Sequence, residues 1–315
     1  MSSIQETPKK LAILLATYNS ENFLEEQINS ILSQTYHNFE IYIRDGGSTD
    51  STLGIISSFQ KKYPRKIFFI GSQHSSPLEN FSALLLAISS NLIMFADHDD
   101  VWMPDKISRS LKAYRELEHK YGTQTPLMVF TDTKVVDVEL NEIAPSMIRY
   151  QHLAPYDLKL SRLLVQNVPN GNTMLFNRAL AELARPIPPS AVMHDHWITL
   201  VAVLFGKIAF LDEPTLLYRQ SGSNVYGAFH YTPLAFLRKA LDGPGRIRKR
   251  FYQNVTQGKA LLERFHDQLP PPEQEILEAF ASLDSMSFLR RRRCILKHRI
   301  YKSGLLRNLG MLLIL

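Results

Sequence analysis

Apolar runs of strand length alternate with amphipathic helical stretches, and this rhythm restricts the fold of the chain more than any other feature. The first four runs lie at residues 11–18, 39–45, 66–71 and 91–97. After the first run, Leu24, Ile28 and Ile31 recur at helical spacing, and the fourth helical stretch begins near Pro104. Four strand and helix alternations predict a mostly parallel sheet lying between helices, which is an α/β fold.

The rest of the chain divides into further strands and a helical end. Apolar runs at 126–137, 172–177 and 207–212 predict three more strands, and the sequence becomes basic and helical from about residue 228. With 315 residues, 45% of them apolar, the chain is long enough to bury a full core. We expect three parts: a flexible N-terminus at 1–9, an α/β domain at 10–227 and a helical region at 228–315.

Polar residues gather where the predicted strands end. Thr17, Tyr18 and Asn19 end the first strand, Asp45 ends the second, and a group of aspartates ends the fourth. Parallel α/β sheets bind ligands beyond the carboxyl ends of their strands. We therefore expect these residues to converge on one crevice.

The group of aspartates lies in the stretch NLIMFADHDDVW, where an apolar run leads into Asp97, Asp99 and Asp100. Carboxylates this close repel one another unless a cation lies among them. Mg²⁺ and Mn²⁺ favour one or two carboxylates plus phosphate oxygens, so the group predicts a metal-assisted clamp for a nucleotide diphosphate. The alternative is a solvated acidic turn that caps the following helix, a description that Asp100 by itself would fit.

Two other short stretches carry candidate site residues. In RDGGSTDST, Asp45 is placed to accept hydrogen bonds from a nucleobase edge, although an ordinary capped loop explains the stretch equally well. In VMHDHWITL, Asp195 lies between two histidines at the start of a helical pattern. A metal site from His194 and His196 is an alternative, but such pairs usually need further spaced ligands. We favour the role of general base for Asp195.

Positive charge is concentrated near the C-terminus. Residues 290–307 contain eight Lys or Arg among leucine-rich turns and no Asp or Glu, against a net charge of +6 for the whole chain. A basic helix with an apolar face suits an anionic membrane surface, and a solvated helix packed on the α/β domain is the alternative. We expect no nucleic-acid partner, because no recognised module or aromatic platform accompanies the charge.

Other features bear on the compartment. The opening MSSIQETPKK lacks the apolar core and cleavage site of a secretory signal, and no apolar stretch reaches the roughly 18 residues of a membrane span. Cys294 is the single cysteine, which excludes a disulfide framework and favours a reducing compartment. We expect a cytoplasmic protein attached peripherally to the inner face of the plasma membrane.

Five motifs, taken in order, carry a family resemblance: ATYNSENFLEEQINSILSQTY, EIYIRDGGSTDST, FADHDDVWMPDKI, NGNTMLFNR and HDHW. Together they resemble glycosyltransferase family 2, and most closely its rhamnosyltransferase-like members from bacterial cell-surface polysaccharide pathways. The resemblance covers roughly residues 10–227, and the rest of the chain matches more loosely.

The resemblance implies a GT-A fold, which is a Rossmann-like nucleotide-binding fold, and inverting transfer from a nucleotide-diphosphate sugar. The donor nucleotide would contact Thr17, Tyr18, Asn19, Asp45 and Asp97, with Asp45 at the base and Asp97 at the ribose. The donor sugar and the acceptor would contact Asn170, Gly171, Asn172 and Trp102. Asp99 would ligate Mg²⁺ or Mn²⁺, Arg219 would contact the diphosphate, and Asp195 would be the catalytic base.

The same resemblance favours dTDP-rhamnose over a UDP-sugar as donor and a lipid-linked glycan as acceptor. Two positions depart from the family pattern. His194 stands where an acidic residue is common before the base, and Ser221 stands where related sequences often have histidine. If that histidine holds metal or diphosphate in relatives, Arg219 and water must suffice here, or metal dependence is weaker.

Three other classes of function remain open at this point. The run LIMFADHDDV also matches the opening of haloacid-dehalogenase-like phosphatases, in which Asp97 would be the nucleophile. That motif normally lies on an early strand, whereas three strand and helix units precede it here. A nucleotidyltransferase would need a glycine-rich loop after the first strand, which LLATYNSENF lacks. A non-catalytic, membrane-bound sugar-binding subunit is the third alternative.

Overall fold

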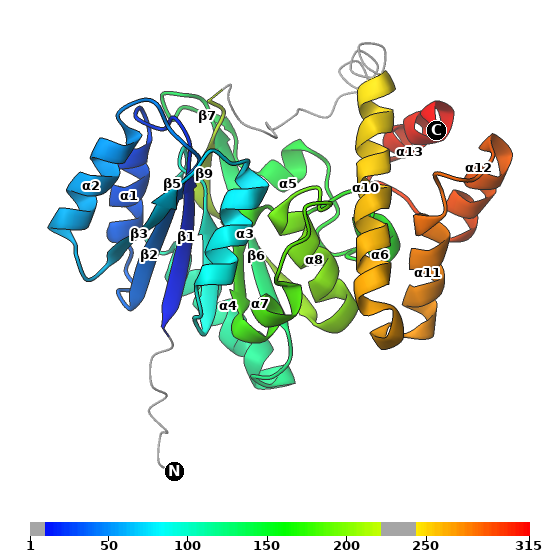
Figure 1. Ribbon diagram of the computed structural model, residues 1–315, viewed down its shortest axis with the longest axis horizontal. Coiled ribbons are helices and arrows are strands. Elements are labelled where there is room, and N and C mark those ends of the chain that lie inside the picture. The colour runs from blue at the N-terminus through cyan, green and yellow to red at the C-terminus, as the bar shows by residue number, and fades with distance from the viewer. Residues whose placement is uncertain (1–9, 222–243) are drawn as a thin grey trace.

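The computed structural model of the protein describes residues 10–221 and 244–315 (Figure 1). The predicted flexible N-terminus at 1–9 and the predicted boundary between residues 227 and 228 lie outside these ranges. A sheet runs through the described part, helices cover both of its faces, and further helices from the C-terminal region lie at one end (Figure 1). The predicted α/β class with a helical C-terminal region is therefore confirmed.

All seven predicted strands are present, and two short ones join them. The strands are β1 (Leu11–Thr17), β2 (Phe39–Asp45), β3 (Ile67–Ser72), β4 (Leu92–Ala96), β5 (Val101–Trp102), β6 (Leu127–Val136), β7 (Glu142–Ala144), β8 (Met174–Asn177) and β9 (Lys207–Arg219). At two and three residues, β5 and β7 are too short to produce an apolar run in the sequence. β9 extends past its predicted end because its pairing with β6 continues to Arg219.

The order of the strands brings the candidate residues to one edge. The sheet runs β3-β2-β1-β4-β8-β6-β9-β5, with β7 paired to β6. β3, β2, β1 and β4 are parallel, whereas β8 runs antiparallel to both of its neighbours, β4 and β6. Because parallel strands end at the same edge, the residues that follow β1, β2 and β4 become neighbours.

The described helices follow the strands as the periodicity predicts. They are α1 (Leu24–Leu32), α2 (Thr52–Lys62), α3 (Pro77–Ala87), α4 (Lys106–Tyr121), α5 (Met147–Tyr150), α6 (Leu160–Leu163), α7 (Arg178–Ala184), α8 (His194–Phe205), α10 (Pro244–Phe265), α11 (Pro271–Ala281), α12 (Phe288–Lys297) and α13 (Leu305–Ile314), with 3-10 turns η1 (Gly171–Thr173) and η2 (His266–Gln268). Residues such as Ser76 fix the ends, since its side chain and Glu79 form a capping box at α3.

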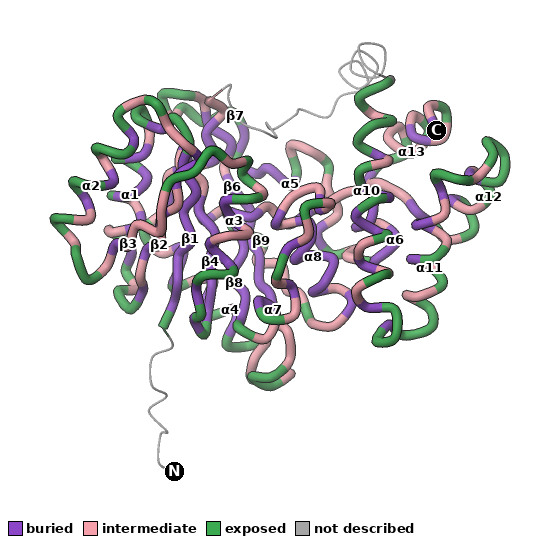
Figure 2. Tube along the Cα trace, in the orientation of Figure 1, coloured by how far each residue is buried: buried purple, intermediate pink, exposed green. Residues whose placement is uncertain are grey.

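β1 shows how the sheet separates two hydrophobic cores. Ile13 and Leu15 pack with α1, α2 and α4, whereas Ala12 and Leu14 pack with α3, α7 and α8 on the opposite face. Every residue of β1 is buried, as expected for a strand covered on both sides (Figure 2). Burial of each large apolar side chain contributes about 1.5–3 kcal/mol before entropy is counted. The two cores therefore stabilise the strands whose ends carry the candidate residues.

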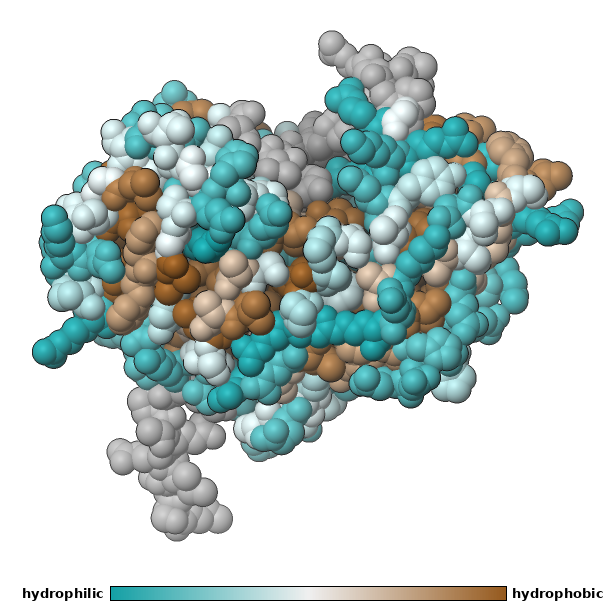
Figure 3. Space-filling view, viewed as in Figure 1, coloured by the Kyte–Doolittle hydropathy of each residue, from teal (hydrophilic) through white to brown (hydrophobic). Residues whose placement is uncertain are grey.

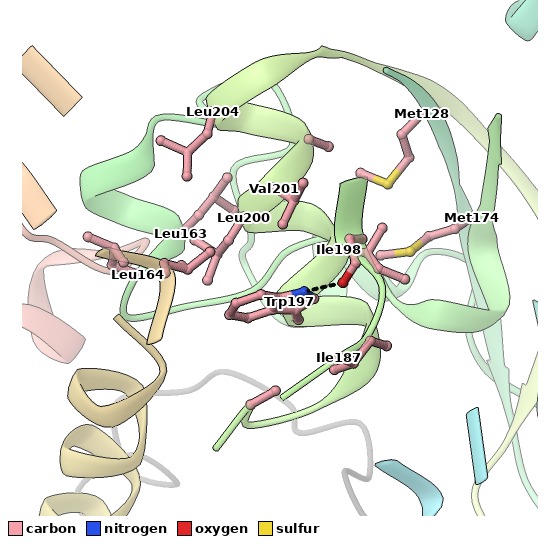
Figure 4. Packing of buried hydrophobic residues seen from close by; sticks show 14 of the residues in the cluster. Met128, Leu163, Leu164, Met174, Ile187, Trp197, Ile198, Leu200, Val201 and Leu204 are labelled. Atoms are coloured by element: carbon pink, nitrogen blue, oxygen red, sulfur yellow. Dashed lines mark hydrogen bonds between the residues drawn. The ribbon is translucent and has the colours of Figure 1, made fainter. Parts of the chain in front are cut away.

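The C-terminal helices pack on the α/β domain. Phe251 and Val255 of α10 belong to the same buried cluster as Trp197 of α8. Trp197 lies among apolar side chains in Figure 4, and its Nε1 donates to the carbonyl oxygen of Ala184 at 2.8 Å. Arg264 of α10 donates to carbonyl oxygens just before and after the end of α7. The inner face of α10 therefore belongs to the core of the α/β domain.

None of the helices within 10–221 and 244–315 combines the length and the apolar character that crossing a bilayer requires.

Candidate active site

Asp45 joins the ends of β1, β2 and β3. Its carboxylate accepts hydrogen bonds from the hydroxyl groups of Thr17 (3.0 Å) and Ser72 (2.8 Å), the N–H groups of Gly47 (3.0 Å) and Ser48 (2.8 Å), and the Ser48 hydroxyl (2.5 Å). Burial alone would raise the pKa of Asp45, but these donors outweigh it and lower the pKa below its ordinary value. Both carboxylate oxygens are therefore already saturated by the protein.

The loop after β1 interlocks with the loop after β2. The N–H of Asn19 donates to the Ser48 hydroxyl at 2.8 Å, and the side-chain oxygen of Asn19 accepts from the N–H of Thr49 at 2.9 Å. Asn19 has φ of 44°, a left-handed conformation that asparagine tolerates. Tyr18 projects between these contacts with 49% of its side chain exposed. Thr17, Asn19 and Asp45 are thus brought together, and Tyr18 is open to a ligand.

The acidic loop follows β4 and brings three carboxylates together. Asp97 is partly exposed, Asp99 is 5% exposed and Asp100 is fully buried. Burial, together with the charges of Asp99 and Asp195, raises the pKa of Asp97 well above its ordinary value. Burial and the charges of Asp99 and Asp97 also raise the pKa of Asp100. The solvated-turn alternative is excluded for this loop, because two of its three aspartates are buried.

The Asn170–Asn172 segment links the acidic loop to Asp195. The side-chain amide of Asn172 donates to Asp100 at 2.5 Å, and the N–H of Gly171 donates to the Asp195 carboxylate at 3.1 Å. A Cβ on Gly171 would lie 2.7 Å from Nε2 of His194, so only glycine fits this approach. Two consecutive residues therefore hold the acidic loop and the candidate base in one site.

Asp195 lies in the first turn of α8 and remains partly exposed. Burial raises the pKa of Asp195 to about 6, although the N–H groups of His196 and Gly171 and the charge of Arg250 oppose that rise. A carboxylate with a pKa near 6 is ionised at neutral pH and is a stronger base than an ordinary aspartate. The charge of Asp195 is also one cause of the raised pKa of Asp97.

The two histidines beside Asp195 are buried and serve separate contacts. His194 stacks on Phe81 with 3.9 Å between ring centroids, and burial lowers its pKa to about 3. His196 lies 2.6 Å from the carbonyl oxygen of Leu163 and 3.2 Å from the amide nitrogen of Gln257. Because the rings engage different partners, the alternative of a metal site between His194 and His196 is not supported.

Arg219 lies behind the acidic loop. Its side chain is buried, and its three nitrogens donate to the carbonyl oxygens of Asp99 and Val138 and to the carboxylate of Glu26. The guanidinium also lies over the ring of Phe23, 4.8 Å from the centroid. This placement differs from the expected fork toward the diphosphate, because each nitrogen already has a protein acceptor. Arg219 fixes the shape of the acidic loop.

Trp102 also differs from its expected place beside the donor sugar. As part of β5 it pairs with Leu216 of β9, and its side chain is 2% exposed within the core that contains α1 and α4. The Lys106 ammonium lies 5.0 Å from its ring centroid. A contact with sugar would require an exposed ring face, so the buried ring of Trp102 does not fit its expected place and belongs instead to this core.

Asp99 is the residue best placed to hold a cation. Ser221 stands where related sequences often have histidine. Its hydroxyl donates to Asp99 Oδ2 at 2.9 Å. Within 10–221 and 244–315, no group of three His, Cys, Asp or Glu side chains converges as a complete metal site. Mg²⁺ needs only one or two carboxylates when phosphate supplies the other oxygens, so Asp99 with the neighbouring Asp97 and Asp100 fits such an ion.

Two contributors to the site escape the sequence reasoning. Ser72 ends β3 and bonds to Asp45, and Gln27 of α1 donates to the carbonyl oxygen of Asp97 at 2.8 Å. Gln27 is fully buried between Leu24 and Ile28 on the core-facing side of its helix. Each residue has a sequence feature that could have identified it. Gln27 is polar at a core-facing helix position, and Ser72 is polar at a strand end.

The fold and this strand-edge site define the protein as a nucleotide-binding α/β protein of the GT-A class. S. aureus TarS 1–349 in complex with UDP-GlcNAc matches with a TM-score of 0.53 and 19% identity, covering 92% of this chain and 88% of that one. Mannosyltransferase PcManGT from Pyrobaculum calidifontis, in complex with GDP-Man and Mn²⁺, matches with a TM-score of 0.55 and 16% identity. The match covers 92% of this chain and 74% of that one. At these identities the likeness concerns the fold.

The chain belongs to glycosyl transferase family 2, whose profile matches residues 12–180. This membership confirms the resemblance at the level of the family and decides against the phosphatase and nucleotidyltransferase alternatives.

Relatives vary in how much of the chain they cover. An uncharacterised glycosyltransferase of Nostoc is 28% identical over 220 residues, which are 68% of this chain and 66% of that protein. The dTDP-rhamnosyl transferase RfbG of Shigella flexneri is 37% identical over 102 residues, 31% of this chain and 35% of that one. The Escherichia coli UDP-Glc:alpha-D-GlcNAc-diphosphoundecaprenol beta-1,3-glucosyltransferase WfaP is 29% identical over 164 residues. These residues are 50% of this chain and 63% of that protein. The chain spans less than two thirds of each of these relatives.

Proposed function

We propose that this protein is an inverting glycosyltransferase of bacterial cell-surface polysaccharide synthesis. It moves a sugar, with rhamnose from dTDP-rhamnose as the first choice, from a nucleotide-diphosphate donor to a lipid-linked glycan. The observation that carries the proposal is the link made by Gly171 and Asn172, which joins the acidic loop to Asp195. A donor site and a base held together in this way are what a direct displacement requires.

The donor nucleotide occupies the edge formed by the ends of β1, β2 and β4. Thr17 and Asn19 shape this pocket, and the exposed ring of Tyr18 offers a face to the nucleobase. Asp45 holds the loops of the pocket through its hydrogen bonds from Ser48 and Ser72. A hydrogen bond from the base edge would reach a carboxylate that already accepts these bonds. Asp97 is partly exposed at the end of β4 and is proposed to contact the ribose.

Asp99 would hold Mg²⁺ or Mn²⁺, which when bound supplies positive charge to the departing diphosphate. The Ser221 hydroxyl orients the Asp99 carboxylate, and Arg219 fixes the backbone of the same residue.

Asp195 performs the proton transfer. Its carboxylate accepts the proton of the acceptor hydroxyl while that oxygen bonds to the anomeric carbon from the face opposite the diphosphate. The bond between the anomeric carbon and the diphosphate oxygen breaks in the same step, so the configuration inverts. The N–H of Gly171 orients the carboxylate at 3.1 Å, and the Asn170–Asn172 segment borders the two sugars.

The named relatives support the choice of substrates. The Shigella relative is named for dTDP-rhamnose, and the E. coli relative is named for a sugar carried on diphosphoundecaprenol. Both names concern proteins that match only part of this chain.

Turnover of donor sugars tests this proposal. We expect the purified protein with Mg²⁺ or Mn²⁺ to release dTDP from dTDP-rhamnose faster than UDP from UDP-glucose, and a lipid extract containing acceptor to accelerate the release. The product's glycosidic configuration, read by NMR, should be opposite to that of the donor. Faster use of UDP-glucose would reassign the donor, and binding without turnover of any donor would favour the non-catalytic sugar-binding alternative.

We also propose that α12 and α13 attach the protein to an anionic bilayer. Leu305, Leu309 and Leu313 form one side of α13 with exposures of 74%, 47% and 81%, whereas Met311 on the other side is 3% exposed. On α12, Phe288 is 59% exposed. Figure 3 shows apolar residues at this end of the molecule.

Basic residues accompany these apolar side chains on α12. They are Arg290, Arg292, Arg293 and Lys297. The exposed leucines of α13 and the cations of α12 each fit the headgroup region of anionic lipids, where each cation contributes about 1 kcal/mol.

Vesicle sedimentation tests the attachment. The triple change of Leu305, Leu309 and Leu313 to serine should abolish sedimentation with phosphatidylglycerol vesicles. The matched change of Leu53 and Leu86, exposed leucines on α2 and α3, should leave sedimentation intact. Equal sedimentation of both variants would contradict the assignment of this face.

A further inference from the structure

A groove lies beside the candidate base, between α10 and the loop that precedes α8. Residues 189–192 form one wall, and Lys249, Tyr252, Gln253 and Thr256 form the other. Its volume of about 540 Å³ is in the range of small-molecule sites. The α10 wall therefore offers an ammonium, an aromatic ring, an amide and a hydroxyl to one ligand.

The N-terminal end of α10, which contributes Lys249 to the groove, is strongly basic. Arg246, Arg248, Lys249 and Arg250 all lie in its first two turns and are exposed. The sequence of α10 has no acidic residue before Glu263. Clustered charges of one sign raise the local concentration of ligands of the opposite sign, so the groove favours an anion.

The groove adjoins the catalytic base. Val192, in the groove wall, is three residues from Asp195, and its N–H donates to Gln257 of α10 at 2.8 Å. The side chain of Gln257 also reaches His196, 3.2 Å from Nδ1. Arg250 is close enough to oppose electrostatically the pKa rise that burial causes at Asp195. The groove wall and the turn that carries Asp195 are therefore linked through Gln257.

The groove is also near the proposed membrane face. α13 contacts α10 and lies beside its upper half in Figure 1, so the exposed leucines of α13 and the basic end of α10 belong to neighbouring helices. A substrate anchored in lipid would meet α13 and the groove together. This neighbourhood favours a lipid-borne anion over a freely diffusing one.

We propose that this groove is the acceptor subsite and that it binds the diphosphate of a lipid-linked acceptor, with Lys249 as the central phosphate contact. The inference rests on the proposed glycosyltransferase function and assigns its acceptor to a place in the fold. Tyr252 and Gln253 contact the sugar next to the diphosphate, which leaves that sugar's hydroxyl toward Asp195.

Calorimetric titration with farnesyl diphosphate tests the subsite. The donor site is first saturated with dTDP and Mg²⁺, so that the probe reports only the second site. Uncharged farnesol and inorganic diphosphate are titrated in parallel. Lys249→Gln should bind farnesyl diphosphate about tenfold more weakly than the wild type, and Lys249→Arg should restore most of the affinity. The matched control is Lys259→Gln, which removes a cation of the same helix that is paired with Asp284 at 2.5 Å.

The outcomes separate this inference from the proposed function. Weaker binding for Lys249→Gln but not for Lys259→Gln, with unchanged dTDP affinity, supports the subsite. Equal affinity of wild type and Lys249→Gln overturns it, as does farnesol binding as tightly as farnesyl diphosphate. Inorganic diphosphate binding as tightly as the lipid would overturn the lipid-linked assignment in favour of a free anion. Absence of any nucleotide binding would instead count against the glycosyltransferase proposal itself.

Discussion

Asp45 and Asp97 occupy equivalent places and have opposite surroundings. Each comes at the carboxyl end of a parallel strand next to β1. The carboxylate of Asp45 accepts hydrogen bonds from Thr17, Gly47, Ser48 and Ser72, and its pKa is lowered. Asp97 instead faces other carboxylates, and its pKa is raised.

The difference separates scaffold from reactive site. A carboxylate whose acceptor sites are filled by the protein holds loops in place and has little capacity left for a ligand. Asp97, Asp99 and Asp100 crowd one loop, and the repulsion that raises the pKa of Asp97 and Asp100 is one that a cation and a diphosphate can relieve. We therefore propose that the Asp45 side of the edge shapes the pocket and that the Asp97–Asp195 side performs the chemistry.

The largest effect should come from the reactive side. Asp195→Asn keeps the size of the side chain but removes the base, so we expect transfer to fall by about 10²–10⁴-fold. Affinity for the nucleotide should stay within about twofold, because no donor contact is lost. Steady-state transfer and calorimetry measure the two quantities. Near-normal turnover would remove Asp195 from the mechanism.

Asp45→Asn should reduce stability, whereas Asp97→Asn should not. The first change replaces a charged acceptor of several hydrogen bonds with an amide, and we expect a loss of about 2–3 kcal/mol in the free energy of unfolding. The second relieves repulsion from Asp99 and should be neutral or stabilising by about 1 kcal/mol. Urea unfolding in metal-free buffer measures both. Equal losses would break the contrast between the two aspartates.

Gly171→Ala tests the link between the two halves of the reactive side. The new Cβ would meet the ring of His194, so the segment must shift and loosen its hold on Asp195 and Asp100. We expect kcat to fall about tenfold, in line with a small displacement of a catalytic group. Gly54→Ala is the control, since nothing lies near its Cβ. If both variants keep full kcat, the link is dispensable.

The pH profile gives a smaller effect around neutrality. Burial raises the pKa of Asp195 from 3.8 to about 6, so transfer should rise as pH increases and level off above about 6. The contribution of Asp195 to the free energy of unfolding changes with pH in the opposite direction. A raised carboxyl pKa favours the neutral acid in the folded state, so this contribution is present at low pH and is lost as pH rises through about 6. A transfer rate independent of pH between 5 and 7 would exclude Asp195 as the base.

The parts of the site that follow from strand order could be predicted from the sequence. Asp97 and Asp99 end an apolar run, and the βα rhythm brings strand ends to one edge, so their meeting with Thr17 and Asp45 needs only the topology. Asp195 comes from a different element, and its place beside Asp97 was reached through the family resemblance.

Trp102 and Arg219 show where the sequence is insufficient. Both belong to β5 or β9, and the antiparallel pairing of these strands turns Trp102 into the core and Arg219 behind the acidic loop. The short strand β5 has no apolar run to reveal it. The contacts of the two residues therefore depend on a pairing that no local pattern encodes.

The C-terminal helices show a similar limit. Their amphipathic pattern left open whether the apolar face meets the domain or a membrane. Ile295 and Met311 are buried against the domain, while Leu305 and Leu313 are exposed on the other side. The two interpretations therefore concern opposite faces of the same helices, a distinction that periodicity alone does not make.

Calorimetric binding of dTDP, UDP and GDP, with and without Mn²⁺, tests the central claim most directly. The proteins compared are the wild type, Asp99→Ala and the control Asp105→Ala, which removes an acid that is paired with Arg109 at 2.7 Å. We predict selective, Mn²⁺-dependent binding of dTDP that Asp99→Ala loses and Asp105→Ala keeps. Nucleotide binding that is the same in all three proteins, or that is absent under every condition, would contradict the claim that the acidic loop is a metal-assisted nucleotide-sugar site.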